Sequence, residues 1–297
     1  MANIVLAHGA WSAAWAWKKM RPLLREAGHQ FFSPTYTGLG ARAHLASPAV
    51  DLSTHVQDIV SEIEFEDLND VVLLGHSYGG MVATGVADKV GSRLARIVYI
   101  DAFAPKDGQS LFDLVGPKAE GNMRKGAEKD GDGWKMPVNP MPPDTAPEDV
   151  AWASPRRRPQ PLKTFEQRIK LESTEPLPPR DYIYATRNGP GDPFRQFADR
   201  ARSEAGWTCH ELDSSHNPHI TCPNEFMALL TKIMAGGKGT TTWPIRSWAS
   251  LDAARAPTTG SRSRAATIRC SRRRGASAPP APRRWPPWAS PSPTCGG

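Results

Sequence analysis

One short stretch constrains the fold of this chain more than any other: residues 71–83, Val-Val-Leu-Leu-Gly-His-Ser-Tyr-Gly-Gly-Met-Val-Ala. It places Ser77 in a G-x-S-x-G frame, between an apolar run typical of a buried strand and a run typical of a helix. In that setting the serine lies on a strained strand-to-helix turn, and its hydroxyl projects from the top of the sheet. Side chains at Gly75 and Gly79 would collide in such a turn. We therefore interpret Ser77 as a candidate nucleophile.

Strand-like and helix-like stretches alternate along most of the chain. The expected strands are residues 3–8, 29–34, 71–75, 96–101, 181–186 and 208–212. The expected helices are residues 14–27, 51–65 (capped by Asp51 or Ser53), 79–90, 194–205 and 224–234. Such alternation is typical of a mostly parallel sheet covered by helices on both faces, so we expect an α/β fold.

The alternation lapses between Pro105 and Pro179, in a region rich in Pro, Gly, Lys and Met that is too long for a simple connection. We expect this insertion to form a lid over the carboxyl ends of the strands, where it would exclude water and shape a pocket. The expected organisation is a first core segment at 1–105, a lid at 106–178, a second core segment at 179–235 and a basic low-complexity tail at 236–297.

The positive charge of the chain is concentrated in that tail. The whole chain has a formal net charge of +7, but residues 236–297 hold eleven basic residues and one acidic residue. Residues 1–235 hold 26 basic and 29 acidic residues, a net charge of −3. The body is therefore mildly acidic, which argues against nucleic acid as its partner. The tail lacks Val, Phe, Tyr and Glu, so we expect it to be disordered.

The cysteines and the N-terminus point to an ordinary reducing compartment. The four cysteines show no C-x-x-C or Cys/His ligand spacing, so we expect free thiols and neither a disulfide framework nor a metal site. The N-terminus has no basic region and only a short apolar run, so we expect no signal peptide and no membrane span. These patterns predict a cytoplasmic protein without a membrane partner. They contain no signal for a particular oligomeric state.

A second motif follows the first expected strand, His-Gly-Ala-Trp at residues 8–11. A nucleophilic serine needs two backbone N–H groups aimed at the developing oxyanion. One is expected from Tyr78, the residue after the nucleophile, and the other from Ala10 in this early loop. The small Gly9 would let the backbone approach a substrate. We interpret His8 as a packing or hydrogen-bonding residue beneath the loop.

The general base is expected late in the chain, because this arrangement orders nucleophile, acid and histidine in that sequence. His216 follows the strand at 208–212, in a loop directly before the last helix, where such a base is required. His210 lies within that strand and is interpreted as structural. His219 is nearer the helix and is interpreted as a pocket or capping residue. We therefore favour His216.

Taken together, these motifs resemble a known family. They are V-L-A-H-G-A-W, P-L-L-x-x-A-G-H, G-L-G-x-R-x-H-L, G-H-S-Y-G-G-M-V and V-Y-I-D-A-F-x-P, in that order. The chain is similar to the α/β-hydrolase superfamily, and within it to bacterial esterases related to plant methylesterases and hydroxynitrile lyases, over residues 3–234. The resemblance implies that Ser77 is the nucleophile and His216 the base, with oxyanion donors at Ala10 and Tyr78.

The resemblance also favours hydrolysis of a small ester through an acyl-enzyme, without metal or organic cofactor. The related lyases typically have a threonine where this chain has Gly9, and a lysine where it has Asn217. Those side chains hold the cyanohydrin hydroxyl and the leaving cyanide. Two alternatives stay open: a hydroxynitrile lyase or carbon–carbon bond hydrolase on the same fold, and a non-catalytic binder of small molecules.

The chain departs from the family at the acid of the triad. The family usually places an Asp a few residues beyond the strand ending near Thr186, and that slot falls on Asn188. An amide cannot stabilise an imidazolium, and Asp-to-Asn in a serine protease triad costs about 10⁴ in turnover. The acid could instead be Asp101 or Asp192, or be absent. We favour Asp101 because it ends a rigid strand, whereas Asp192 precedes a proline in a loop.

The expected substrate pocket is apolar or aromatic. Trp134, Met136 and Trp152 lie in the lid segment, and Trp11 lies beside the oxyanion loop. We treat Gly9, Trp11 and Trp134 as candidate substrate contacts. The alternative is that these aromatic side chains only pack the lid.

Overall fold

The computed structural model of the protein describes residues 1–189 and 191–236. The sequence-based expectation for the tail falls on residues that lie, apart from Gly236, outside this part. Among the helices described, none has the length and apolar character needed to cross a membrane. In the same part of the chain, no three His, Cys, Asp or Glu side chains cluster as metal ligands would.

The centre of the fold is a six-stranded sheet in which all neighbouring strands are parallel. Its strands, in spatial order, are β2 (Gln30–Phe32), β1 (Asn3–Ala7), β3 (Val71–His76), β4 (Leu94–Ile100), β7 (Arg180–Ala185) and β8 (Trp207–Leu212). The register pairs Ala7 with Gly75 and His76 with Ile100 at the ends of the strands. The carboxyl ends therefore meet at one edge, where ligands bind in sheets of this kind.

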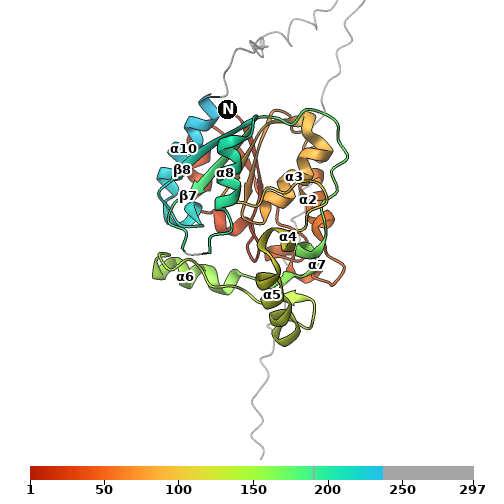
Figure 1. Ribbon diagram of the computed structural model, residues 1–297. Helices are drawn as coiled ribbons and strands as arrows, with labels where there is room; N and C mark the ends of the chain where they lie inside the picture. The colour runs from red at the N-terminus through yellow and green to blue at the C-terminus, as the bar shows by residue number, and fades with distance from the viewer. Residues whose placement is uncertain (190, 237–297) are drawn as a thin grey trace, which may run out of the picture. The chain divides into compact units, whose positions relative to one another are not determined.

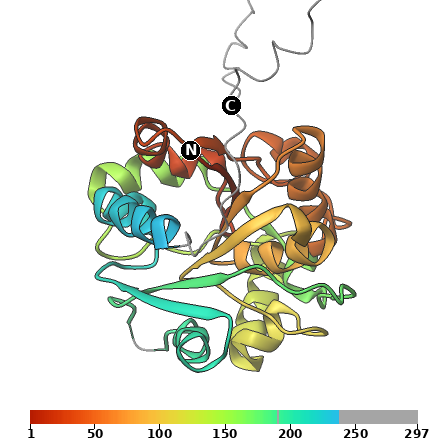
Figure 2. The ribbon, with the colours of Figure 1, turned by 90° about the horizontal axis from the view of Figure 1, so that it is seen from above.

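Side-chain alternation along the strands builds two cores, one on each face of the sheet. In β1, Ile4 and Leu6 join one apolar cluster, while Val5 and Ala7 join the other. The first face is covered by α1 (Met20–Glu26) and α10 (Pro223–Gly236), together with the 3₁₀ turn η1 (Ala14–Trp17). The second is covered by α2 (Leu52–Phe65), α3 (Gly79–Val90) and α8 (Arg195–Ser203). Figure 2 shows both layers of helices around the sheet.

Two helices illustrate how the sequence determines local structure. Asp51 caps α2, because its carboxylate accepts the backbone N–H of Thr54 at 2.9 Å. The single helix expected at 14–27 is instead divided into η1 and α1. Pro22 explains the break, since it has no N–H for a continuous helix and is tolerated only near a helix start.

The insertion at 106–178, called the lid segment below, forms short elements. They are α4 (Leu111–Val115), α5 (Pro117–Asp130), β5 (Lys135–Met136), α6 (Pro147–Ala153), η4 (Ser154–Arg156), β6 (Gln160–Pro161) and α7 (Lys163–Glu166). Figure 1 shows its helices gathered on one side of the sheet. The remaining short helices are η2 (Gly40–Leu45), η3 (Gly91–Arg93) and α9 (Pro218–Thr221).

Candidate active site

Ser77 lies in the sharp turn between β3 and α3, with a backbone φ of 56°. Its N–H donates to the Ile100 carbonyl at 3.3 Å, and its own carbonyl accepts the N–H of Phe103 at 3.1 Å. A Cβ atom on Gly79 would lie 2.0 Å from the Ala7 carbonyl oxygen, and one on Gly80 would lie 2.0 Å from that of Phe103. The glycines therefore allow the backbone packing that holds this left-handed serine in place.

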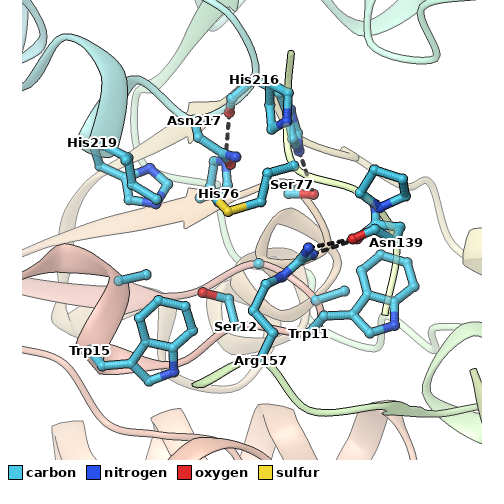
Figure 3. A pocket seen from close by; sticks show the side chains of 17 residues that line it. Trp11, Ser12, Trp15, His76, Ser77, Asn139, Arg157, His216, Asn217 and His219 are labelled. Atoms are coloured by element: carbon cyan, nitrogen blue, oxygen red, sulfur yellow. Dashed lines mark hydrogen bonds between the residues drawn. The ribbon is translucent and has the colours of Figure 1, made fainter. Parts of the chain in front are cut away.

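Ser77, His216 and Asp101 form one hydrogen-bonded line. The Nε2 atom of His216 lies 3.0 Å from Ser77 Oγ, and its Nδ1 atom lies 2.7 Å from Asp101 Oδ2 (Figure 3 shows the first contact). The Phe194 ring stacks on the His216 ring at 4.7 Å between centroids. With Asp101 ionised, Nδ1–H donates to the carboxylate and Nε2 accepts the serine proton.

Asp101 follows β4 directly and is 1% exposed. Burial raises the pKa of its carboxyl group, while hydrogen bonds from His216, Asn188 and Ala185 act in the opposite direction. Asn188 Nδ2 lies 3.1 Å from each carboxylate oxygen, and the Ala185 N–H donates to Oδ1 at 3.2 Å. The amide in the family's usual acid slot thus supports a carboxylate on the neighbouring strand.

Asp192 is oriented differently. Its Oδ2 accepts the Tyr184 hydroxyl at 2.8 Å, and its Oδ1 accepts the N–H of Phe194 at 2.8 Å. Asn188 is also within 3.4 Å of Oδ1. Of the two candidate acids, the structure brings Asp101 to His216, while Asp192 caps its own loop.

Of the two candidate oxyanion donors, Ala10 lies in the loop after β1, and Tyr78 directly follows Ser77 at the start of α3. Within residues 1–189 and 191–236, neither the Ala10 nor the Tyr78 N–H donates a hydrogen bond to the chain. A Cβ on Gly9 would lie 2.9 Å from His76 Nδ1 and 3.2 Å from Ser77 Cβ. A side chain at this position would therefore require His76 or the loop to shift.

His8 supports the same loop from below. Its Nδ1 donates to the Gly9 carbonyl at 2.9 Å, and its Nε2 accepts the Tyr36 N–H at 3.2 Å. Complete burial lowers the pKa of His8 to about 3, so the ring is neutral at physiological pH. This contact fits the structural interpretation made from the sequence.

Trp11 has a backbone φ of 55°, which is strained for an aromatic residue. Its N–H donates to Gln160 Oε1 at 3.1 Å, and its indole N–H donates to the Met136 carbonyl at 3.1 Å. Gln160 is fully buried and donates from Nε2 to Thr164 Oγ1 at 2.9 Å. The lid segment therefore holds the strained residue next to Ala10.

Histidines support the site from two other sides. His55 Nε2 donates to the Thr37 carbonyl at 3.0 Å, and its Nδ1 accepts the Tyr78 hydroxyl at 2.9 Å. Burial lowers the pKa of His55 to about 4. His76 Nε2 donates to the backbone carbonyl of His216 at 2.8 Å (Figure 3), and burial holds its pKa well below the ordinary value.

The other two late histidines have structural surroundings. His219 is buried and stacks on Trp17 with ring centroids 4.7 Å apart, and burial lowers its pKa to about 3. It also lines the pocket, as expected from the sequence. His210 lies in β8, where its Nε2 is 2.8 Å from Asp181 Oδ1.

Ser77 and His216 open onto a cavity of about 260 Å³ (Figure 3). Its apolar walls come from the core and the lid segment: Trp11, Trp15, Pro140, Met141, Pro142 and Ile220. Its polar lining includes Ser12, Asn139, Arg157 and Asn217. Gly9 and Trp11 line it as expected, but Trp134 does not. Trp134, in the turn between α5 and β5, lines a separate cavity with Arg124 and Glu166.

Sequence reasoning missed several supporting residues. Gln160 and Trp11 are 149 positions apart in the sequence, so no local pattern predicts the hydrogen bond between them. Arg157 and Asn139 lie in the segment where periodicity lapses. Of the missed residues, His76 could have been recognised from the sequence, because it lies inside the G-x-S-x-G motif.

Comparison with known proteins shows which family this chain is similar to. The model of the alpha/beta hydrolase family matches residues 4–229. The chain is 37% identical to the carbendazim hydrolyzing esterase of Nocardioides sp. (strain SG-4G) over 243 residues, 78% of this chain and 100% of the relative. It is 26% identical to pheophorbidase of Raphanus sativus over 257 residues, 78% of this chain and 94% of the relative. Among solved structures, an extracellular alpha/beta-hydrolase from a Paenibacillus species has a TM-score of 0.69 and 26% identity, covering 78% of this chain and 98% of that one.

Proposed function

The chain belongs to the α/β-hydrolase family, and on that premise we propose that it is a serine esterase that cleaves carboxylic esters through an acyl-enzyme. Membership confirms the fold and the family expected from the sequence motifs, and the esterase relatives support ester hydrolysis as the reaction. The observation that carries the finer proposal is the continuous hydrogen-bonded line from Ser77 through His216 to Asp101.

In this proposal Ser77 Oγ attacks the ester carbonyl carbon while His216 Nε2 takes its proton. Asp101 stabilises the imidazolium that forms. The N–H groups of Ala10 and Tyr78 bind the oxyanion of the tetrahedral intermediate. His216 then protonates the leaving alcohol, and the acyl group remains on the serine. A water molecule deprotonated by His216 attacks the acyl-enzyme, and His216 then returns the proton to Ser77 Oγ as the acid leaves.

The choice of acid rests on geometry and charge. Asp101 lies at hydrogen-bond distance from His216 Nδ1, whereas Asp192 is bound to Tyr184 and to its own loop. Three donors surround the Asp101 carboxylate, and hydrogen bonds to the charged form favour ionisation despite burial. The departure at Asn188 therefore leaves the proposed triad complete.

The proposed substrate is a small apolar or aromatic ester. The support is the cavity, which is small for a ligand site and is walled by tryptophan, proline, methionine and isoleucine side chains. The name of the carbendazim hydrolyzing esterase supplies the first compound to assay, since that relative is matched over its whole length.

Two measurements test the mechanism. Wild-type protein should hydrolyse p-nitrophenyl acetate and should be labelled by a fluorophosphonate, and Ser77→Ala should abolish both. Asp101→Asn should lower kcat by about 10⁴, whereas the matched change Asp192→Asn should leave kcat within about threefold. Turnover and labelling that do not depend on Ser77 would refute the esterase mechanism. Release of cyanide from mandelonitrile without ester turnover would favour the lyase.

A further inference from the structure

Arg157 brings a positive charge into the cavity that contains Ser77. Its guanidinium donates to both the backbone carbonyl and the side-chain oxygen of Asn139, and Figure 3 shows it extending into the pocket beside that residue. A guanidinium has five N–H donors in a planar fork. Two of them hold the fork in position, so others can bind a ligand.

No acidic side chain faces this charge. Arg157 is the only Lys, Arg, Asp or Glu among the lining residues in the part of the chain that the structure describes. It also takes part in none of the ion pairs formed within residues 1–189 and 191–236. Of the other four arginines of the lid segment, Arg124 and Arg168 are paired with carboxylates. The remaining two bind backbone carbonyls and, unlike Arg157, are exposed.

Partial burial makes this unpaired cation costly. Burial lowers the pKa of Arg157 to about 10, so the guanidinium is still charged at neutral pH. The lining histidines His76 and His219 have lowered pKa values and add no charge that would repel it or an anion. A buried charge is stabilised when a partner of opposite sign enters its site.

We propose that Arg157 selects esters that carry a carboxylate at the end remote from the scissile bond, as in the half-esters of dicarboxylic acids. This inference rests on the proposed esterase function and adds a charged remote group to the apolar ester proposed above. The ester carbonyl lies at Ser77, the intervening chain lies against the apolar walls, and the remote carboxylate binds the Arg157 fork. Asn139 positions the fork.

Matched pairs of methyl esters test the inference. The monomethyl and dimethyl esters of succinate, glutarate and adipate have the same scissile bond and differ in the remote charge. We expect kcat/KM of the wild-type protein to favour the monomethyl ester at one chain length. Arg157→Met should lower kcat/KM for that monomethyl ester about 10- to 100-fold, the range expected when a hydrogen-bonded charge pair is lost. The dimethyl ester should change less than threefold.

Two further variants serve as controls. Arg157→Lys keeps the charge without the fork and should retain part of the preference. Arg156→Met removes a neighbouring exposed arginine that binds the Trp152 carbonyl and does not line the cavity, so the preference should persist.

The outcomes separate the inference from the proposed function. If wild-type protein hydrolyses the dimethyl esters and shows no preference for any monomethyl ester, the inference is wrong and the esterase stands. If Arg157→Met lowers both ester types equally and also lowers Tm, the arginine only fastens the lid segment and the inference is wrong. If no ester is turned over and Ser77 is not labelled, both are wrong.

Discussion

Replacing Gln160 with methionine tests whether the lid segment shapes the proposed oxyanion hole. The side chains have similar length, but methionine offers no oxygen to the Trp11 N–H, which Gln160 accepts at 3.1 Å. The Trp11 N–H belongs to the same peptide unit as the Ala10 carbonyl, and the proposed oxyanion donor, the Ala10 N–H, lies in the peptide unit before it. We expect that loss of the acceptor lets the strained Trp11 backbone relax. The Ala10 N–H would then turn away from the carbonyl oxygen of the substrate.

The structure sets the size of the expected effect. Gln160 is fully buried and its hydrogen bond with the Trp11 N–H is partly buried, so leaving that N–H without its acceptor costs about 1–3 kcal/mol. The left-handed conformation of Trp11 costs about 1–2 kcal/mol, and this strain is relieved if the backbone relaxes in the variant. If the first cost falls on the transition state, kcat decreases about 5- to 150-fold. Loss of one oxyanion donor, about 10²–10³-fold, is the upper limit.

The assay is steady-state hydrolysis of p-nitrophenyl acetate, with kcat and KM measured separately and Tm measured in parallel. Gln167→Met is the matched control. Gln167 also lies in the lid segment and accepts a backbone N–H of the core, that of Ser53 at 2.8 Å, but it does not line the cavity. The Gln167→Met substitution should lower Tm without lowering kcat. Equal loss of kcat in both variants, or an unchanged kcat in Gln160→Met, would refute the reasoning.

Three further predictions concern charge and packing. Asn188→Ala removes two hydrogen bonds that lower the pKa of Asp101, so the acid limb of the kcat/KM profile should move to higher pH; an unmoved limb would contradict this role. His8 and His219 have pKa values of about 3 in the folded protein, against 6.5 in the unfolded chain. Between these values the unfolded state binds more protons than the folded state. The free energy of unfolding should therefore fall as the pH drops from about 6.5 toward 3. Urea titrations should show this slope, and His219→Phe should reduce it; equal slopes would exclude the contribution. Gly9→Ala places a Cβ 3.2 Å from Ser77 Cβ and should slow fluorophosphonate labelling about 10-fold, through the cost of overpacking, while leaving the far-ultraviolet circular dichroism unchanged.

The sequence predicts the fold well because its signals are local. Apolar alternation in β1 and β3, the cap at Asp51 and the glycines around Ser77 each act within a few residues. Parallel strands then bring their carboxyl ends to one edge, and that edge is where Ser77, Asp101 and His216 were expected to meet. Pro22 changed only a helix boundary.

The sequence predicts the pocket poorly, because its walls depend on contacts between distant segments. Gln160 and Arg157 lie in a proline-rich segment whose path is set by tertiary packing, and no periodicity specifies which side chains face inward. Trp134 shows the difficulty: its aromatic side chain in the lid segment suggested a pocket residue, but it lines another cavity. Asn188 was recognised as a departure, but its partner became visible only when two strands were placed side by side.

The contact between Asn188 and Asp101 has a consequence for the position of the negative charge. An amide and a carboxylate of the same shape lie 3.1 Å apart, on loops that follow two adjacent strands. Exchanging them, Asp101→Asn with Asn188→Asp, would preserve the number of atoms at the site and move the negative charge from one loop to the other. The intermediate with two carboxylates would hold one of them protonated, because like charges so close cannot both ionise. Two single substitutions would therefore move the negative charge between the loops that follow β4 and β7.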